Sequence, residues 1–156
     1  MKKILLNTGE TALVDNQDFK YLSQFRWTRK TDGKNIYAIR YQKISSRNYK
    51  RYSMHREILN LTNPKILVDH KDHNGLNNQR KNLRQCNAAQ NCWNSVSAKG
   101  KSKFKGVTQY PSGSYRVRIG VNGVRMHLGV FKNELDAHNA YKEAAKKFHK
   151  EYACYE

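Results

Sequence analysis

The stretch KILVDHKDHNGLNNQRKNLRQC, residues 65–86, joins two short runs suited to strands through a long polar loop. The first run is apolar and ends in Asp69 and His70, and the second begins at Leu83. The loop between them is rich in Asn, Asp and Gly, which favour turns. The stretch therefore predicts a β-hairpin closed around a long loop.

A helix is expected directly after this hairpin, in NAAQNCWN, residues 87–94. Asn87 followed three residues later by Gln90 is a capping-box pattern, which marks the start of a helix. A hairpin followed at once by a helix brings Asp69 and His70 beside the first turns of that helix.

The chain is strongly basic. Its 156 residues contain 30 Lys and Arg against 12 Asp and Glu, a formal net charge of +18. Such a charge is typical of a protein whose partner is a polyanion, either nucleic acid or an anionic membrane surface. Membrane is the weaker alternative, since no stretch approaches the roughly 20 apolar residues of a bilayer span. The N-terminal apolar run is also too short for a signal peptide.

The three cysteines are Cys86, Cys92 and Cys154. Their odd number and the lack of a repeated CxxC spacing indicate neither a disulfide framework nor a four-cysteine zinc site. Cys86 and Cys92 are separated by five residues, outside the usual spacing of paired zinc ligands. This cysteine usage fits a reducing cytosol.

Both halves of the chain are basic. Residues 1–98 carry 18 basic and 7 acidic side chains, and residues 99–156 carry 12 and 5. Each half also has aromatic and patterned apolar residues, which favours folded domains over a disordered arm. Small and basic residues in 95–103 indicate a linker. We expect an α+β protein with a small N-terminal α+β scaffold, a central segment, a linker and a C-terminal domain, at residues 1–53, 54–98, 99–103 and 104–156.

The N-terminal scaffold has hairpin and helix patterns. A strand from Trp27, the turn 31–34 and the alternating run 35–42 predict a hairpin. Short helices are expected after Asp15 and over residues 54–59. His55 on the second helix is expected to be a packed or partly exposed histidine and not a ligand.

The central segment resembles the HNH (ββα-metal) endonucleases, closest to those of phage homing endonucleases. The resemblance covers residues 54–94 and rests on Asp69-His70-x-Asp72-x-Asn74-x-x-Asn77-Asn78-x-x-x-Asn82-Leu83-Arg84, followed by Asn91. It implies a metal-dependent endonuclease that hydrolyses phosphodiester bonds in double-stranded DNA. It also implies a cytoplasmic setting, at DNA in a bacterial or phage-infected cell, and it implies no particular protein partner.

The resemblance also implies a role for each site residue. Asp69 and Asn91 would be the metal ligands, His70 the general base, and Asn82 the residue that orients this histidine. Hard oxygen ligands suit magnesium or manganese and suit zinc poorly. Adjacent strand residues point to opposite faces, so Asp69 can face the helix while His70 faces the substrate. An imidazole, with a pKa near 6.5, suits a general base.

The other polar residues of the loop are expected to close turns through bonds to nearby backbone amides; these are Asp72, Asn74, Asn77 and Asn78. One residue departs from the family pattern: His73 stands where the family often has glycine. This departure bears on the local conformation of the loop. A role for His73 as an extra ligand or phosphate contact is the weaker alternative.

The C-terminal segment predicts a three-stranded antiparallel sheet packed on one helix. Asn122-Gly123 is a two-residue hairpin signal. It sets a register that places on one apolar face the pairs Val121/Val124, Ile119/Met126 and Val117/Leu128. The opposite face carries Arg116, Arg118, Arg125 and His127. A helix with Asn133 as N-cap would cover the apolar face with Ala137, Ala140, Tyr141, Ala144 and Phe148.

This segment, over residues 104–152, is similar to the APETALA-type, ethylene-response-factor-like DNA-binding domain, by its pattern KGV…P-x-G-x-Y-x…NG-x-R-x-x-x-LG-x-F…A-x-x-A-Y…A. The positions that match base-contacting residues of that family are Lys105, Thr108, Tyr110, Ser112, Arg118, Gly120, Arg125 and His127. Several lack the Arg or Trp of the plant domains, so no target sequence transfers. We expect DNA binding through Lys105, Tyr110, Arg116, Arg118, Arg125 and His127.

Two other function classes stay open. A non-catalytic, sequence-specific DNA-binding regulator could retain the nuclease framework, although the full set of site residues speaks against it. An RNA-binding protein of ribosomal type would match the charge but gives no reason for the spacing of Asp69, His70 and Asn91. With one nuclease site per chain, nicking of one strand per engagement is the expected outcome.

Overall fold

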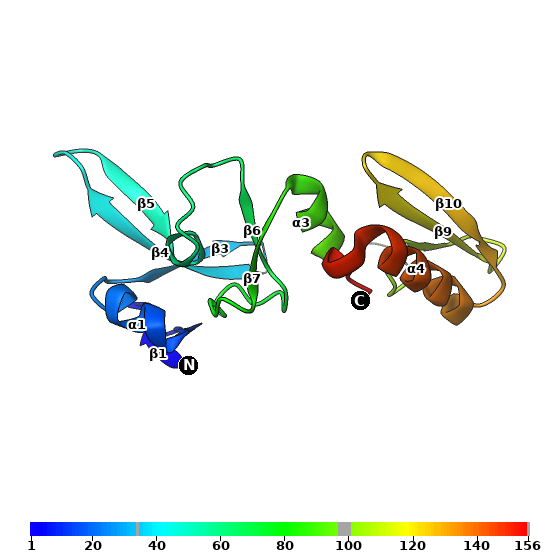
Figure 1. The fold of residues 1–156 in the computed structure, drawn as a ribbon. Helices are drawn as coiled ribbons and strands as arrows, with labels where there is room; N and C mark the ends of the chain where they lie inside the picture. The colour runs from blue at the N-terminus through cyan, green and yellow to red at the C-terminus, as the bar shows by residue number, and fades with distance from the viewer. Residues whose placement is uncertain (34, 97–100, 156) are drawn as a thin grey trace. The chain divides into compact units, whose positions relative to one another are not determined.

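The computed structural model describes residues 1–33, 35–96 and 101–155 (Figure 1). Two compact units make up the chain, Met1–Asn87 and Ala88–Glu156, which we name unit 1 and unit 2. Helices and small antiparallel sheets occur in both, which confirms the predicted α+β class. In the part of the chain that the structure describes, no helix is both long and apolar enough to cross a bilayer.

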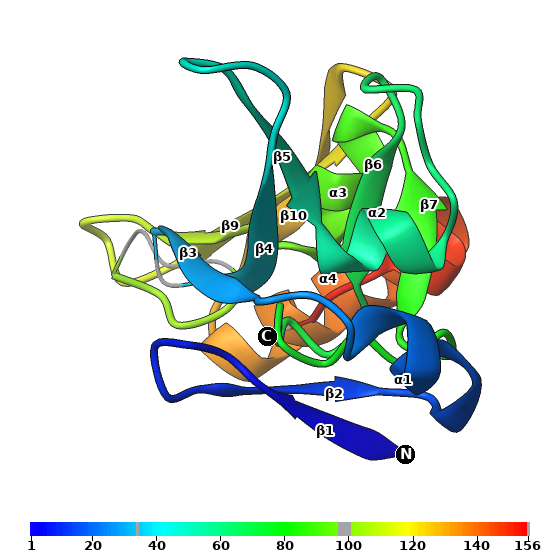
Figure 2. The same ribbon diagram turned by 90° about the vertical axis from the view of Figure 1, so that its left-hand side faces the viewer.

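Unit 1 contains three small antiparallel sheets and two short helices, with the β1–β2 hairpin along one side next to α1 (Figure 2). Strand β4 is central between β3 and β5, and β6 pairs with β7. The elements are β1 (Lys2–Leu5), β2 (Thr11–Val14), α1 (Asn16–Leu22), β3 (Thr28–Asp32), β4 (Asn35–Lys43), β5 (Tyr49–Ser53), α2 (Met54–Ile58), β6 (Leu67–His70) and β7 (Leu83–Cys86).

These elements confirm the predicted N-terminal hairpin and both short helices. Asp32 pairs with Asn35 across the β3–β4 turn, of which Lys34 lies outside the described residues. Helix α1 follows Asp15 as expected, but the Asp15 side chain does not cap it. Its carboxylate accepts hydrogen bonds from Gln79 Nε2 and from the Arg80 amide, at 3.4 and 2.8 Å. A residue expected to start a helix thus also holds the loop before β7.

The core of unit 1 centres on Trp27, which is 1% exposed. Its indole N–H donates to the Leu22 carbonyl at 2.8 Å, so the buried polar atom is satisfied. Arg40 lies beside this core: its guanidinium is 4.0 Å from the Phe25 ring centroid and donates to Glu57 at 2.8 Å. The burial of this pair is tolerable because the charge is both paired and packed on aromatic faces.

Unit 2 carries a helix, a sheet of order β10-β9-β8 and a long C-terminal helix. Asn133 caps this last helix through a hydrogen bond from the Asp136 amide at 2.8 Å, which confirms the predicted N-cap. The elements are α3 (Ala88–Asn94), β8 (Val107–Gln109), β9 (Tyr115–Val121), β10 (Val124–Phe131), α4 (Glu134–His149) and the 3₁₀ helix η1 (Lys150–Tyr152).

The register of the β9–β10 hairpin is confirmed near its turn and is wrong farther along. Val124 pairs with Val121 and Met126 with Ile119, as Asn122-Gly123 predicts. The expected pairing of Val117 with Leu128 is not formed, because a bulge after His127 places Val117 opposite Gly129. Gly129 has φ +140°, a backbone conformation that side chains rarely adopt. A bulge inserts one residue into one strand and shifts the register beyond it.

The buried line of α4 differs in part from the predicted face. The fully buried positions recur every four residues: Ala137, Tyr141, Ala145 and His149. Ala144 and Phe148 pack at the edge of the core, whereas Ala140 is only half-buried and outside it. The buried line therefore runs through Ala145 and His149 instead of Ala140, so the sequence prediction was wrong there.

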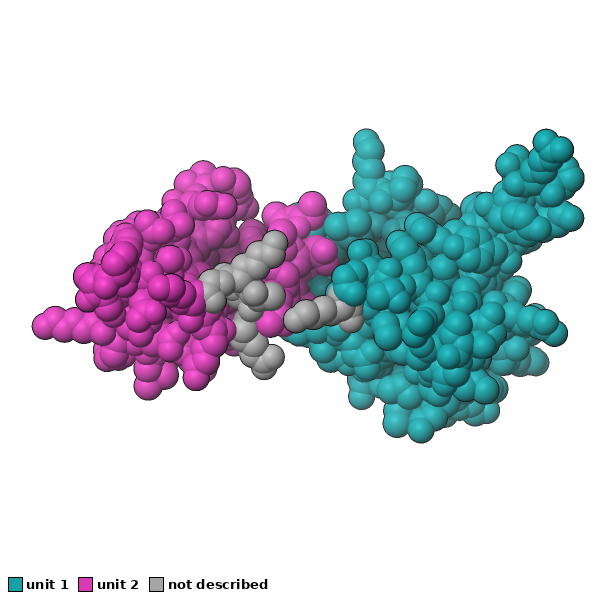
Figure 3. All heavy atoms as spheres, turned by 180° about the vertical axis from the view of Figure 1, so that it is seen from behind, with its two compact units in different colours: residues 1–87 teal, residues 88–156 magenta. Residues whose placement is uncertain are grey.

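The predicted linker falls partly outside the described residues, at 97–100. Just beyond this gap, Ser102 is buried, and its hydroxyl donates to Glu134 at 2.7 Å and accepts from the Phe104 amide at 3.1 Å. Ser102 therefore belongs to the folded structure of unit 2, which Figure 3 colours separately from unit 1. The expected limits of the four segments stay predictions.

Candidate active site

The β6–β7 hairpin carries the residues expected to do chemistry. Asp69 pairs with Arg84 and His70 with Leu83 across the two strands. Asp69 is 6% exposed and His70 is 5% exposed. Both polar side chains are thus held inside unit 1 at the end of one strand, where neighbouring residues point to opposite faces.

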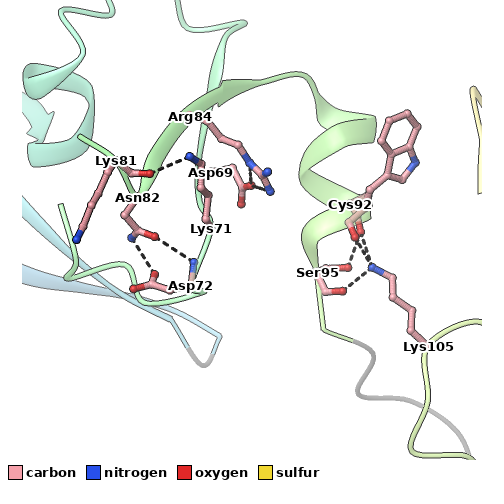
Figure 4. Close-up of polar contacts among 10 residues, drawn as sticks. Asp69, Lys71, Asp72, Lys81, Asn82, Arg84, Cys92, Ser95 and Lys105 are labelled. Atoms are coloured by element: carbon pink, nitrogen blue, oxygen red, sulfur yellow. Dashed lines mark hydrogen bonds and ion pairs between the residues drawn. The ribbon is translucent and has the colours of Figure 1, made fainter. Parts of the chain in front are cut away.

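Asp69 forms a buried ion pair with Arg84 (Figure 4). Arg84 Nε and Nη2 both lie 2.7 Å from Asp69 Oδ2. The two side chains are only 7% and 12% exposed, so solvent screens this pair weakly. The guanidinium offsets the carboxylate charge inside the fold. The sequence pattern included Arg84 but assigned it no role.

His70 lies in a cluster of rings from three elements. The His55 ring of α2 meets it edge-on at 5.3 Å between centroids, and the Tyr37 ring of β4 lies at 5.8 Å. Burial lowers the pKa of His70 below its ordinary value, against the raising effects of Asn78, Asp72 and Asp69. Because its pKa is lowered, His70 is neutral at pH 7 and able to accept a proton.

Asn78 contacts the His70 ring, with Asn78 Oδ1 3.4 Å from Nε2. An amide oxygen only accepts hydrogen bonds, so this contact favours the tautomer with the proton on Nε2. The lone pair of the neutral ring is then on Nδ1. Asn78 is fully buried and was expected only to close the loop. Its distance from His70 in sequence gave no indication of this contact.

Asn82 holds the loop, and the His70 ring is contacted by Asn78 instead. The Asn82 side-chain amide donates to Asp72 Oδ1 at 2.8 Å, and its oxygen accepts from the Asp72 amide at 3.1 Å (Figure 4). The same amide donates to the Asn77 carbonyl at 2.8 Å. Asn82 therefore acts on the backbone that follows His70. That Asn82 orients the histidine stays a prediction.

The remaining Asx residues close turns as predicted. Asp72 Oδ1 accepts from the Asn74 amide at 2.9 Å, and Asn74 Oδ1 accepts from the Leu76 amide at 3.0 Å. Asn77 Nδ2 donates to Asp72 Oδ2 at 2.6 Å. The Asp72 carboxylate is the centre of this network, which lowers its pKa despite the opposing effect of burial.

His73 occupies a left-handed backbone conformation, with φ +61°. This conformation is strained for most side chains and open to glycine, which explains why the family pattern has glycine there.

Contacts with the N-terminal scaffold fix the loop. The Leu13 amide donates to the Leu76 carbonyl and the Asn78 amide to the Leu13 carbonyl, each at 2.8 Å. Arg80 forms two hydrogen bonds with the Asp18 carboxylate, at 2.7 and 2.9 Å. A Cβ at Gly75 would collide with the Ile36 carbonyl oxygen and the Tyr37 ring. Residues far apart in sequence thus hold the loop in place.

Asn91 lies on α3, which belongs to unit 2. The Trp93 ring of this helix stacks on His149 of α4, with centroids 4.4 Å apart and planes at 9°. Lys105 Nζ donates to the Trp93 and Ser95 carbonyls at 2.6 Å and to the Cys92 carbonyl at 3.2 Å (Figure 4). The sharing of one metal by Asp69 and Asn91 stays a prediction.

The expected DNA-contacting residues of unit 2 divide into two groups. Lys105 caps the C-terminal end of α3, and burial lowers the pKa of its ammonium. Tyr110 follows β8, and the other four lie on the polar face of the sheet, where His127 pairs with Arg118 as predicted. A hollow of about 280 Å³ is lined there by Gly106, Val107, Thr108, Arg118, Ile119, Gly120 and Arg125. The Arg116 guanidinium lies 5.1 Å from the Tyr110 ring centroid.

The cysteines form no metal site among the described residues, where no group of three or more His, Cys, Asp and Glu is placed to hold a metal. All three are free thiols, with Cys86 and Cys154 buried and Cys92 exposed. Burial raises the pKa of the Cys86 thiol to about 11, with Asp69 acting in the same direction. This thiol is therefore an inert core residue at neutral pH.

One known protein resembles the chain over nearly its whole length. The two sequences are 28% identical over 151 residues, which cover 94% of this chain and 74% of the relative. The relative, from Acanthamoeba polyphaga mimivirus, is named an uncharacterized HNH endonuclease. No protein-family model matches the chain, and no solved structure matches it. The chain is thus similar to a protein named an HNH endonuclease.

Proposed function

We propose that this protein is a metal-dependent HNH endonuclease that hydrolyses phosphodiester bonds in double-stranded DNA. The observation that carries the proposal is the buried Asp69-His70 pair at the end of β6, with Arg84 on the carboxylate and Asn78 on the imidazole. A structural loop has no need of a buried neutral histidine beside a buried carboxylate, since both cost desolvation energy. The similarity to a protein named an HNH endonuclease supports the same reaction class.

His70 would act as the general base. Its lowered pKa keeps the ring neutral at pH 7, and the Asn78 contact favours a lone pair on Nδ1. This nitrogen would take the proton from the water that attacks phosphorus, a role worth roughly 100- to 10,000-fold in rate. Asn82 would act indirectly, by holding the Asp72 turn that follows His70.

Asp69, with Asn91 of α3, would hold a divalent metal. A carboxylate and an amide oxygen are hard ligands, and magnesium or manganese completes its shell with water and phosphate oxygens. The fit rests on the donor chemistry of a buried carboxylate, for which the Arg84 guanidinium on Asp69 Oδ2 competes with a cation. The cation would stabilise charge on the phosphate and on the departing 3′ oxygen.

Unit 2 would hold the DNA through the polar face of its sheet. Arg118 and Arg125 line the hollow of about 280 Å³, and arginine is a side chain that binds phosphates and guanine edges. We include Tyr110, Arg116 and His127 in this surface. For Lys105 we propose a structural role, because its ammonium caps α3.

The biological setting is proposed from resemblance: a phage-type homing endonuclease that nicks one strand per engagement in the cytoplasm of a bacterial or phage-infected cell. The second candidate is a non-catalytic DNA-binding regulator. The ion pair between Asp69 and Arg84 favours the regulator, since such a pair keeps the buried carboxylate neutralised in a fold that holds no metal.

Cleavage of supercoiled plasmid tests the proposal. The purified protein is incubated with magnesium or manganese and plasmids that carry candidate intron-free target alleles. We expect relaxed circles, with loss of activity in His70→Ala, Asp69→Ala and Asn91→Ala. The matched control is Asp32→Ala, which removes a carboxylate from an exposed position and should keep cutting.

The outcomes separate the two candidates. Metal-dependent nicking that His70→Ala and Asp69→Ala abolish supports the nuclease. Tight binding to a DNA target with no cleavage in either metal identifies the regulator, and preference for folded RNA over duplex DNA excludes both. Linear products at the first turnover would show that the enzyme cuts both strands.

A further inference from the structure

We propose that the ribbon formed by the ends of β4 and β5, residues 41–51, is a DNA-docking surface separate from the active site and from the sheet of unit 2. Duplex DNA as the partner rests on the proposed function; the surface itself rests on the geometry of unit 1. In Figure 3 this ribbon projects from the body of unit 1.

The ribbon is a two-stranded extension of a three-stranded sheet. Strand β3 pairs with β4 only from Asp32↔Asn35 to Thr28↔Ile39. Beyond Ile39, β4 continues with β5 alone through Lys43↔Tyr49. Four residues of strand span about 13 Å, and a two-stranded β-ribbon fits the major groove, which is about 12 Å wide and 8.5 Å deep.

Every residue of the ribbon is exposed. Residues 41–51 contain four basic side chains and no acidic one, namely Lys43, Arg47, Lys50 and Arg51. Tyr41 is 57% exposed and Tyr49 is 60% exposed, although both are large and partly apolar. Exposed aromatic and basic residues in one patch favour a surface that binds a polyanion over an ordinary solvated turn.

The pairing places these residues on one face. Tyr41 is opposite Arg51 and Lys43 is opposite Tyr49, and paired residues two positions apart share a face. On the other face, Gln42 and Lys50 are also exposed, and Arg40 and Tyr52 at the base of the ribbon pack together, with the guanidinium 4.3 Å from the Tyr52 ring centroid. The face of Tyr41, Lys43, Tyr49 and Arg51 therefore combines two phosphate-binding cations with two aromatic rings that can reach sugars and base edges.

Binding of the full-length protein to a labelled 30-base-pair duplex, measured against salt concentration, tests the ribbon. We expect Lys43→Ala/Arg51→Ala to weaken binding about tenfold and to reduce the slope of log affinity against log salt by about 2, one per phosphate contact. Tyr41→Ser/Tyr49→Ser should weaken binding with the slope unchanged. The matched control is Lys3→Ala/Lys20→Ala, which removes the same charge from exposed positions of unit 1.

Equal effects of the ribbon and control variants would overturn the proposal, as would unchanged affinity in both ribbon variants. If the wild type cuts DNA and the ribbon variants bind it with normal affinity, the proposal for the ribbon is refuted and the proposed nuclease function stands. If the wild type never cuts DNA and the ribbon variants bind it more weakly, the ribbon is supported as a docking surface and the proposed nuclease function is refuted. If the wild type does not bind duplex DNA, both the docking proposal and the proposed nuclease function are refuted.

Discussion

The side-chain oxygen of Asn78 lies 3.4 Å from His70 Nε2 in the interior of unit 1. We expect Asn78→Ala to lower kcat about 10- to 100-fold with little change in KM, as is typical when the partner that orients a functional histidine is removed. Asn78→Asp should move the acid limb of the pH–rate profile upward, because a carboxylate favours the imidazolium. A folded Asn78→Asp enzyme with an unshifted acid limb would contradict this role.

Arg84→Ala should destabilise unit 1 by about 3–5 kcal/mol, because it leaves the buried Asp69 carboxylate without its cation. Manganese should then raise the melting temperature of Arg84→Ala more than that of the wild type, since the metal replaces the lost charge. Arg29→Ala is the control: its partner is Glu10 and its side chain is 52% exposed, so its loss should cost less than about 1 kcal/mol. Equal costs for the two variants would contradict the prediction.

His73→Gly should be more stable than His73→Ala by about 1 kcal/mol, because both remove the side chain and only glycine relieves the positive φ. Urea unfolding measures the difference. The same pair at Lys20, on α1, should show the opposite sign, since glycine costs about 1 kcal/mol relative to alanine within a helix. A glycine variant at 73 that is no more stable than alanine would show that the strain is relieved elsewhere.

The pKa of His55 is lowered to about 3, first by burial and then by His70 and Arg56. A histidine with a lowered folded pKa stays neutral in the fold while the unfolded chain binds a proton. The contribution of neutral His55 to the free energy of unfolding is therefore fully present above about pH 6.5. It is lost as the pH falls below that value, by up to about 1.4 kcal/mol per pH unit.

His55→Leu should flatten this acid dependence between pH 6.5 and 4.5. Unfolding of unit 1 is followed by Trp27 fluorescence in a Trp93→Phe background, so that the second tryptophan does not contribute. The exposed His127→Gln variant should retain the wild-type dependence. An unchanged slope in His55→Leu would assign the acid lability to another group.

Lys105→Met should lower the stability of unit 2 and leave the salt dependence of DNA binding unchanged, because its ammonium bonds to carbonyls at the end of α3. Arg125→Met, on the exposed part of β10, should leave the stability of unit 2 unchanged and reduce the slope of log affinity against log salt by about 1. A reduced slope in Lys105→Met would instead support the DNA contact expected from resemblance.

Local patterns in the sequence were enough for the β3–β4 and β6–β7 hairpins and for the short helices, whereas β1, β2 and β5 were not predicted. The β6 and β7 limits follow from two short runs around an Asx-rich loop, and Asn122-Gly123 determined the register next to its turn. These features depend on contacts between residues that are near in sequence. The same is true of the Asp72 turn, where a side-chain bond to a nearby backbone amide was predicted and Asp72 accepts one from the Asn74 amide.

The sequence by itself determined which residues stand at the end of β6, and only the tertiary structure decided what surrounds them. Asn78 rather than Asn82 contacts His70, Arg84 compensates Asp69, and His55 packs against the catalytic candidate. The bulge before Gly129 is another such feature. Periodicity and turn propensity report the local backbone, whereas side-chain partners and buried charge depend on which distant segments fold together, so those contacts could not be read from spacing.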